Sequence, residues 1–215
     1  RMATRPGMAD QALGFRGLGY LALWRGEMAR AGEFFRRAAG LSRQQRAATS
    51  LLRNLALLAA TQQAAGDQAG VLRTLAQVDS VAALPQLPPG FLALAAEPHA
   101  VEGDVGRVRA LLDEMRKRVD PRNGDDSAQV HYVAGTLALA EGEPRRAAAA
   151  FEMAAGYRFP ATLRYRQALA QERVGELDSA RVLLKALAST PSFGSEDQIA
   201  STRALIDLGA VEERL

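Results

Sequence analysis

Residues 134–154 read AGTLALAEGEPRRAAAAFEMA, and the same arrangement of small and large residues recurs along most of the 215-residue chain. A turn glycine, Gly142, lies near the centre of this segment. A small residue, Gly135, stands seven positions before it, and a large apolar residue, Phe151, stands nine positions after it. Equivalent glycines follow one another at intervals of 33 to 40 residues, at Gly26, Gly66, Gly103, Gly142 and Gly175. A period of this length predicts an array of helical repeats.

Four positions around each turn glycine hold residues of similar character in all five copies. Seven residues before the glycine the chain has Gly19, Ala59, Ala96, Gly135 and Ala168. Five residues after it stand Ala31, Val71, Val108, Ala147 and Ala180. Nine after it come Phe35, Leu75, Leu112, Phe151 and Leu184, and twelve after it Ala38, Val78, Met115, Ala154 and Leu187. Small residues let two helices approach closely, and the large residue fills the wedge between them and the next hairpin.

The residues around the turns predict where the helices begin and end. Glycine supplies the left-handed conformation that ends a helix. Asp67 and Asp104 stand where an N-cap acceptor is needed, and Pro144 fits the first turn of a helix because no N–H is needed there. Longer breaks between hairpins contain proline, at 84–90, 120–124, 159–160 and 190–191. None of these breaks is long enough for a domain linker, so we expect one continuous array over residues 1–215.

Composition supports an all-α fold. Alanine and leucine number 43 and 29 of the 215 residues, and both favour helices, whereas the residues that favour strands are scarce. The absence of cysteine excludes disulfides, thiolate metal sites and a cysteine nucleophile. The net charge is only +3, because 27 basic residues face 24 acidic ones, and so the balance does not predict nucleic-acid binding. The sequence contains no run of 18 apolar residues, and so it predicts no membrane-spanning segment.

The hairpins at residues 18–38 and 134–154 resemble tetratricopeptide (TPR) repeats. The resemblance covers residues 12–190 as five repeats, at about 12–45, 52–85, 89–122, 128–160 and 161–190, and the family's length of about 34 residues is met by the last interval. Departures occur where His131 and Arg164 replace a large apolar residue and where Gln167 replaces a leucine. The resemblance implies an all-α, right-handed superhelical solenoid of antiparallel helix hairpins.

Residues 195–215 predict a further helix, introduced by a capping box at 195–198. Its apolar line of Ile199, Leu205, Leu208 and Val211 or Leu215 predicts packing on one side only. Two interpretations stay open: this helix caps the solenoid, or it is the first half of another repeat. The chain also begins with Arg1 and not with methionine, and so we expect it to be a piece of a longer protein.

Catalytic and metal-binding patterns are missing from the sequence. The two histidines, His99 and His131, are 32 residues apart, and we interpret each as a packing residue satisfied by backbone, so no metal and no cofactor is expected. The glycines of Gly14–Gly19 lack the lysine of a phosphate-binding loop, and we interpret them as close helix packing. The carboxylate pairs at 125–126 and 212–213 are adjacent in sequence and point apart. We therefore expect that the protein is not an enzyme.

The densest basic run, Arg116-Lys117-Arg118 with Arg122, has acidic residues beside it. Basic residues near a helix C-terminus complement the helix dipole. The run also lacks the aromatic residues that stand among the basic ones in proteins that bind single-stranded nucleic acid. We interpret this run as a charged helix end. Contact with phosphate or nucleic acid is the alternative interpretation.

The resemblance implies a concave groove lined by the first helix of each hairpin. The groove residues that we predict to bind a partner are Arg16, Tyr20, Trp24, Tyr132, Thr136, Tyr165 and Arg173. Tyrosine, tryptophan and arginine are enriched at interface hot spots, and so we expect the three tyrosines to be exposed. We also expect Tyr132 and Tyr165 to tolerate replacement by alanine. Trp24 has a second interpretation, as the cover of a seam between repeats. Between the two ends, alanines that include Ala56, Ala60 and Ala93 would form a smooth floor for an apolar helix or an extended peptide.

These observations favour a non-catalytic protein–protein interaction scaffold that binds a peptide or helix. The alternative is the regulatory or sensor repeat region of a longer bacterial signalling protein, such as a kinase or a transcription regulator. A cytoplasmic location is favoured, and an extracytoplasmic region of a longer protein is the alternative. The sequence does not identify the partner.

Overall fold

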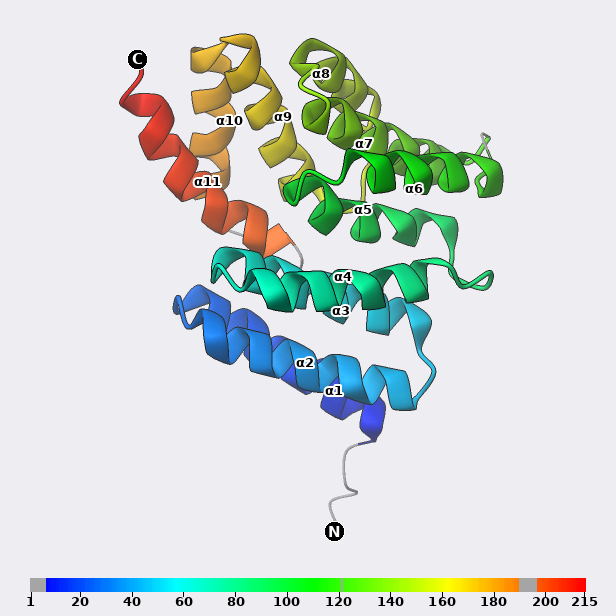
Figure 1. Ribbon diagram of the computed structural model, residues 1–215. Helices are drawn as coiled ribbons and strands as arrows, with labels where there is room; N and C mark the ends of the chain where they lie inside the picture. The colour runs from blue at the N-terminus through cyan, green and yellow to red at the C-terminus, as the bar shows by residue number, and fades with distance from the viewer. Residues whose placement is uncertain (1–6, 121, 190–196) are drawn as a thin grey trace, which may run out of the picture. The chain divides into compact units, whose positions relative to one another are not determined.

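The computed structural model describes residues 7–120, 122–189 and 197–215, and within these ranges it contains α-helices and no strand. The prediction of an all-α fold is confirmed. The helices, drawn in Figure 1, are α1 Met8–Trp24, α2 Met28–Gln44, α3 Ala48–Ala64, α4 Gln68–Ala82, α5 Leu92–Val101, α6 Val105–Arg118, α7 Gly124–Ala140, α8 Pro144–Met153, α9 Pro160–Val174, α10 Leu177–Ser189 and α11 Asp197–Glu212. One turn of 3-10 helix, Pro89–Phe91, precedes α5.

The helices form two compact units, residues 1–98 and 99–215, with the boundary inside α5. In the first unit α2 packs on α1 and α3, and α3 packs on α4. In the second unit consecutive helices from α6 to α11 pack on one another, and α11 also packs on α9. The helices named in these pairs therefore pack on their neighbours in sequence, as the repeat pattern predicts. The expectation that all repeats form one continuous array stays a prediction.

All five turn glycines adopt the left-handed backbone conformation, with φ between 71° and 96°. In the turn between α7 and α8, the Glu143 N–H donates to the Ala138 carbonyl at 2.8 Å, and the Gly142 N–H donates to the Leu139 carbonyl at 3.2 Å. The same pair of hydrogen bonds recurs at the other four glycines. This is the Schellman motif, which satisfies carbonyls at the end of a helix. The predicted turn positions are confirmed.

A sixth turn of this type joins α2 to α3 and contains no glycine. Arg46 occupies the left-handed position with φ 54°, and the Ala47 N–H donates to the Ser42 carbonyl at 3.0 Å. A residue with a Cβ is less stable than glycine in this conformation. A search for glycines cannot find such a turn, although the predicted repeats at 12–45 and 52–85 leave a gap that begins at this connection.

The predicted helix starts are also confirmed. The Asp67 carboxylate caps α4 by accepting from the Gly70 N–H at 2.8 Å, and the Asp104 carboxylate caps α6 by accepting from the Arg107 N–H at 3.0 Å. Pro144 is the first residue of α8. Each cap satisfies a backbone donor that has no partner inside its helix.

Every residue at the four repeated positions is buried. Two of the small residues are glycines because a phenylalanine ring lies directly on them. A Cβ added to Gly19 would be 2.5 Å from a ring carbon of Phe35, and a Cβ added to Gly135 would be 2.5 Å from a ring carbon of Phe151. Where leucine stands in place of phenylalanine, as at Leu75 and Leu184, alanine stands in place of glycine. The sizes of the two residues are complementary within each hairpin.

The final helix differs from its prediction. Ser195 and Glu196 of the expected capping box lie outside the described residues, and the carboxylate of Asp197 accepts from the backbone N–H and the hydroxyl of Thr162, both at 2.8 Å. Leu205, expected on the buried side, is 53% exposed. The buried line is instead Ala200, Ala204 and Val211, with Leu208 packed at its edge. Small residues fill this line because α11 lies against both α9 and α10.

Candidate interaction surface

The three tyrosines expected to be exposed in a groove are buried. The exposed fractions of Tyr20, Tyr132 and Tyr165 are 4%, 0% and 8%, and Thr136 is buried as well. The predicted exposure is wrong for the three tyrosines, and Thr136 does not line an open groove. They support the hairpins from within, and so they are not available to contact a partner in this conformation.

Aromatic neighbours cover Tyr20 and Tyr132. The Tyr132 ring, on α7, stacks on Tyr157 with centroids 3.8 Å apart and planes 5° from parallel. It also lies 5.9 Å from the ring of Phe151. Tyr157 belongs to the segment between α8 and α9, at the end of the fourth predicted repeat. In the first hairpin, the Tyr20 ring meets the Phe35 ring edge-on at 5.7 Å.

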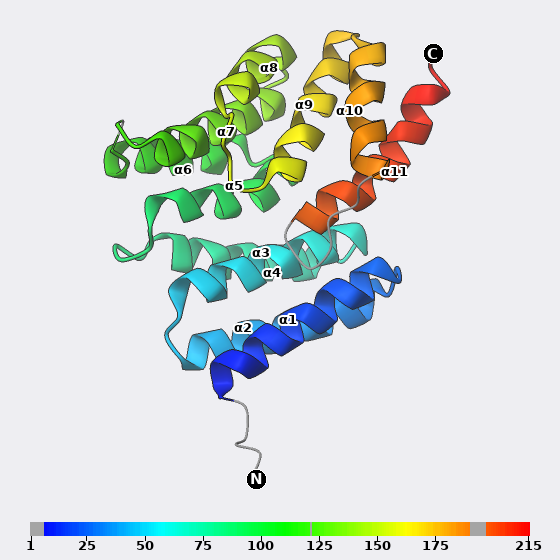
Figure 2. The ribbon, with the colours of Figure 1, turned by 180° about the vertical axis from the view of Figure 1, so that it is seen from behind.

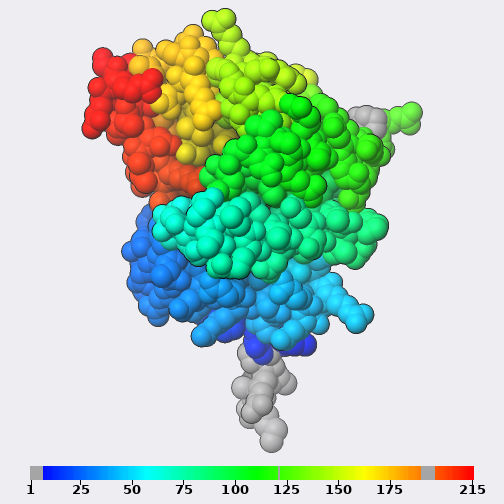
Figure 3. Space-filling view, in the orientation of Figure 1, coloured from blue at the N-terminus to red at the C-terminus, as the bar shows by residue number. Residues whose placement is uncertain are grey.

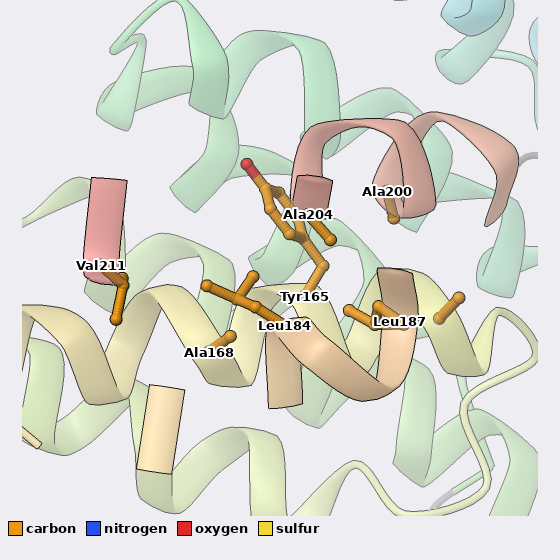
Figure 4. Packing of buried hydrophobic residues seen from close by; sticks show 8 residues of the cluster. Tyr165, Ala168, Leu184, Leu187, Ala200, Ala204 and Val211 are labelled. Atoms are coloured by element: carbon orange, nitrogen blue, oxygen red, sulfur yellow. The ribbon is translucent and has the colours of Figure 1, made fainter. Parts of the chain in front are cut away.

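Tyr165 is covered by α11. Its ring on α9 belongs to a cluster that includes Ala168, Leu184 and Ala204, as Figure 4 shows. The hydroxyl donates to the carboxylate of Asp207 on α11 at 2.7 Å. Burial of the hydroxyl, together with this hydrogen bond and the nearby negative charge, raises the pKa of Tyr165 well above its usual range.

The raised pKa of Tyr165 predicts a loss of stability at high pH. Above about pH 10 the unfolded chain releases the tyrosine proton while the folded chain keeps it, and so the free energy of unfolding falls as pH rises. Tyr165→Phe removes this contribution. We expect the stability difference between wild type and Tyr165→Phe to shrink from about pH 8 to about pH 11, by up to about 1.4 kcal/mol per pH unit, as measured by urea denaturation. Parallel pH profiles for the two proteins would contradict the assignment.

The predicted arginines have different environments. Arg173 is exposed at the end of α9, and its guanidinium donates to the Leu139 carbonyl near the end of α7 at 2.8 Å. Arg16 is half-buried on α1. Tyr132 and Thr136 lie one turn apart on α7, and Arg173 reaches the same helix. The expected alanine floor is also partly wrong, because Ala93 is buried.

Trp24 is the one predicted aromatic residue that is exposed, at 46%, and it belongs to an apolar face of α1. Leu13, Leu18 and Leu21 on the same helix are between 44% and 58% exposed. Figure 2 shows α1 in dark blue at the edge of the first unit, and little of it is visible from the opposite side in Figure 3. Large exposed apolar patches on folded proteins mark interaction sites. We call this set of Leu13, Leu18, Leu21 and Trp24, with Gly14 and Gly17 between them, the α1 face.

The glycines of the α1 face correct another expectation. A Cβ at Gly14 or Gly17 would meet no atom within 4 Å, and so these two residues do not serve close packing inside the described chain. Only Gly19 does so. In the sequence, the α1 face is indicated by large apolar residues that do not occupy any of the four repeated positions.

The remaining candidate features are smaller. A cleft of about 180 Å³ is lined by Ala148, Glu152, Gln167, Gln171 and Leu183, from α8, α9 and α10. In the basic run, Arg116 pairs with Asp113 at 3.7 Å, and Arg118 pairs with Glu114 at 3.9 Å. These ion pairs agree with the interpretation of the run as a charged helix end.

His99 is buried, as expected, and its imidazole Nδ1 lies 3.3 Å from the carboxylate of Asp104. His131 is half-buried. Within the described residues, no group of three or more histidine, aspartate or glutamate side chains converges on a point where a metal ion could bind. The described helices include none with the length and apolar character needed to cross a membrane. Neither a protein-family model nor a curated protein matches this sequence.

Proposed function

We propose that this chain is a non-catalytic protein-interaction scaffold, built as a right-handed TPR-like solenoid, and that it binds an α-helix on the α1 face. The observation that carries the proposal is the exposure of Leu13, Leu18, Leu21 and Trp24 on one helix, α1. Exposed leucines and a tryptophan around two glycines form a surface into which an apolar helix stripe can pack.

The packing of α3 on α2 supports a helix as the ligand. A Cβ at Gly32 of α2 would lie 3.8 Å from both Leu58 and Thr61 of α3, and so these two residues cover the small-residue stripe of α2. Leu58 and Thr61 stand eight and five residues before the turn glycine of their hairpin. The equivalent residues of α1 are Leu18 and Leu21. The α1 face therefore presents leucines where α3 contacts a neighbouring helix.

A peptide with the sequence of α2, residues 28–44, is the probe that this equivalence suggests. Trp24 is the sole tryptophan of the chain and lies at the edge of the α1 face, and so its fluorescence reports on occupancy. We expect a saturable blue shift as the peptide is added to dilute, monomeric protein, because binding removes water from the indole ring.

Variants then assign the binding to the α1 face. Leu18→Glu combined with Leu21→Glu should abolish the blue shift while the melting temperature stays near that of wild type, because both side chains are exposed. Leu72→Glu is the matched control, since Leu72 is 59% exposed on α4, away from the face. A blue shift that persists in the double variant, or that is lost in Leu72→Glu, would count against the α1 face as the binding surface.

A further inference from the structure

The α1 helix has the composition of a helix that is covered on two sides, but the described residues of its unit cover it on one side. The α3 helix, which packs between α2 and α4, buries nine of its 17 residues. The α1 helix has the same length and is more apolar, yet it buries only five. It also shows little separation of apolar and polar sides, whereas α2 is strongly amphipathic. A helix that is apolar all round is one that is buried all round, and so the α1 face is suited to a second helix layer.

The α1 face is complementary to itself when two copies run antiparallel. Helical spacing puts Asp10, Gly14, Gly17, Leu18, Leu21 and Arg25 on one side of α1. In an antiparallel pair centred between residues 17 and 18, Leu21 faces the partner's Gly14, and Leu18 faces the partner's Gly17. Each leucine then enters the space left by a glycine, where a Cβ would meet no atom within 4 Å.

The charges at the two ends of the face agree with the same register. Asp10 lies in the first turn of α1, and Arg25 follows its last residue. Both are exposed. The antiparallel pairing places Asp10 opposite the partner's Arg25, and twofold symmetry repeats this contact at the other end. A parallel pairing would instead place like charges opposite each other. The arrangement of charge therefore favours the antiparallel orientation.

We propose that the occupant of the α1 face is a second copy of this chain, paired antiparallel through α1 with Gly14 opposite the partner's Leu21. This inference rests on the proposed function and names the partner. The resulting order of helices across the interface is α2, α1, the partner's α1 and the partner's α2. Each α1 is then covered on both sides, as α3 is within the chain.

Substitution of the glycines distinguishes this specific pairing from non-specific hydrophobic association. Gly14→Leu makes the face more apolar and removes a helix-destabilising glycine, but it fills the space that the partner's Leu21 needs. We expect sedimentation equilibrium to show a wild-type dimer, a dissociation constant at least tenfold higher for Gly14→Leu, and a monomer for Leu21→Glu. Gly209→Leu is the matched control, because Gly209 is exposed in α11 with open space around it, and it should dimerise as wild type does. Stronger association of Gly14→Leu would overturn the proposal.

Disulfide cross-linking tests the register. The chain has no cysteine, and so any disulfide comes from introduced residues. Gly14→Cys combined with Leu21→Cys should cross-link into dimers under mild oxidation. The two positions lie about 10 Å apart along one helix, too far for a bond within one copy. Either substitution alone should cross-link poorly, because identical residues are distant in the antiparallel pair. Efficient cross-linking of the single variants would indicate a parallel pair and overturn the register.

The outcomes separate this inference from the proposed function. A wild-type protein that stays monomeric at about 1 mM, where even a weak dimer of about −4 kcal/mol would form, overturns the second copy as occupant. If the α2 peptide still shifts the Trp24 fluorescence of that monomer, the α1 face remains a helix-binding surface with another partner. If the peptide also has no effect, the proposed function fails together with the dimer.

Discussion

Gly135→Ala should lower the free energy of unfolding by about 1–3 kcal/mol, although it adds only one methyl group and replaces a helix-destabilising residue. The reason is steric: the new Cβ would lie 2.5 Å from the ring of Phe151, which is fully buried and cannot move into solvent. Gly135→Leu, with a larger side chain, should reach the upper end of this range or exceed it. Urea denaturation of the purified variants measures both losses.

Gly124 provides the matched control in the same helix. It is exposed in the first turn of α7, its φ is not positive, and a Cβ there would meet no atom within 4 Å. Gly124→Ala and Gly124→Leu should therefore cost less than about 0.5 kcal/mol. Equal losses at Gly124 and Gly135 would mean that the contact with Phe151 does not limit the size of residue 135.

A double variant tests whether the sizes of residues 135 and 151 are coupled. Gly135→Ala with Phe151→Leu recreates the alanine and leucine that the chain has at Ala59 and Leu75 and at Ala168 and Leu184. Phe151→Leu alone leaves unfilled volume and should also be destabilising. We expect the double variant to be more stable than the sum of the two losses predicts, with a coupling of about 1 kcal/mol or more. Strict additivity would contradict the complementary packing.

Tyr132→Ala should be the most destabilising single truncation in α7, with a loss of about 3–5 kcal/mol. The Tyr132 side chain is completely buried, stacks on Tyr157 at 3.8 Å and contacts Phe151. Removing it leaves a cavity between α7 and the segment that follows α8. This expectation replaces the one drawn from sequence, in which Tyr132→Ala leaves the fold intact.

Tyr132→Phe is the control for the ring. It keeps the stacked aromatic surface and should stay within about 1 kcal/mol of wild type, while the alanine variant melts at a much lower temperature. Thermal denaturation followed by circular dichroism compares the two. A Tyr132→Ala protein that is as stable as wild type would restore the exposed-groove interpretation of this residue.

The features that sequence predicts correctly here depend on local chemistry and on spacing. Gly142 and its four equivalents end helices because glycine adopts the left-handed conformation at no steric cost. Asp67 and Asp104 cap helices because a short carboxylate reaches the free backbone N–H groups. The buried positions, such as Ala147 and Phe151, follow from the helical period, which places them on one side of each helix. Each of these effects is set within a few turns of one hairpin.

The features that sequence does not predict depend on what another segment covers. Tyr132 and Trp24 both lie on the first helix of a hairpin. The segment between α8 and α9 places Tyr157 on the Tyr132 ring, whereas 46% of Trp24 is exposed. Tyr165 is closed off by α11, whose buried line is Ala204 and not Leu205. Helical period alone says which residues share a side of a helix, and burial of that side requires a partner segment whose position is set by tertiary packing. Turns and hairpins were therefore predictable from local rules, whereas the exposed surface emerged only once the helices were placed against one another.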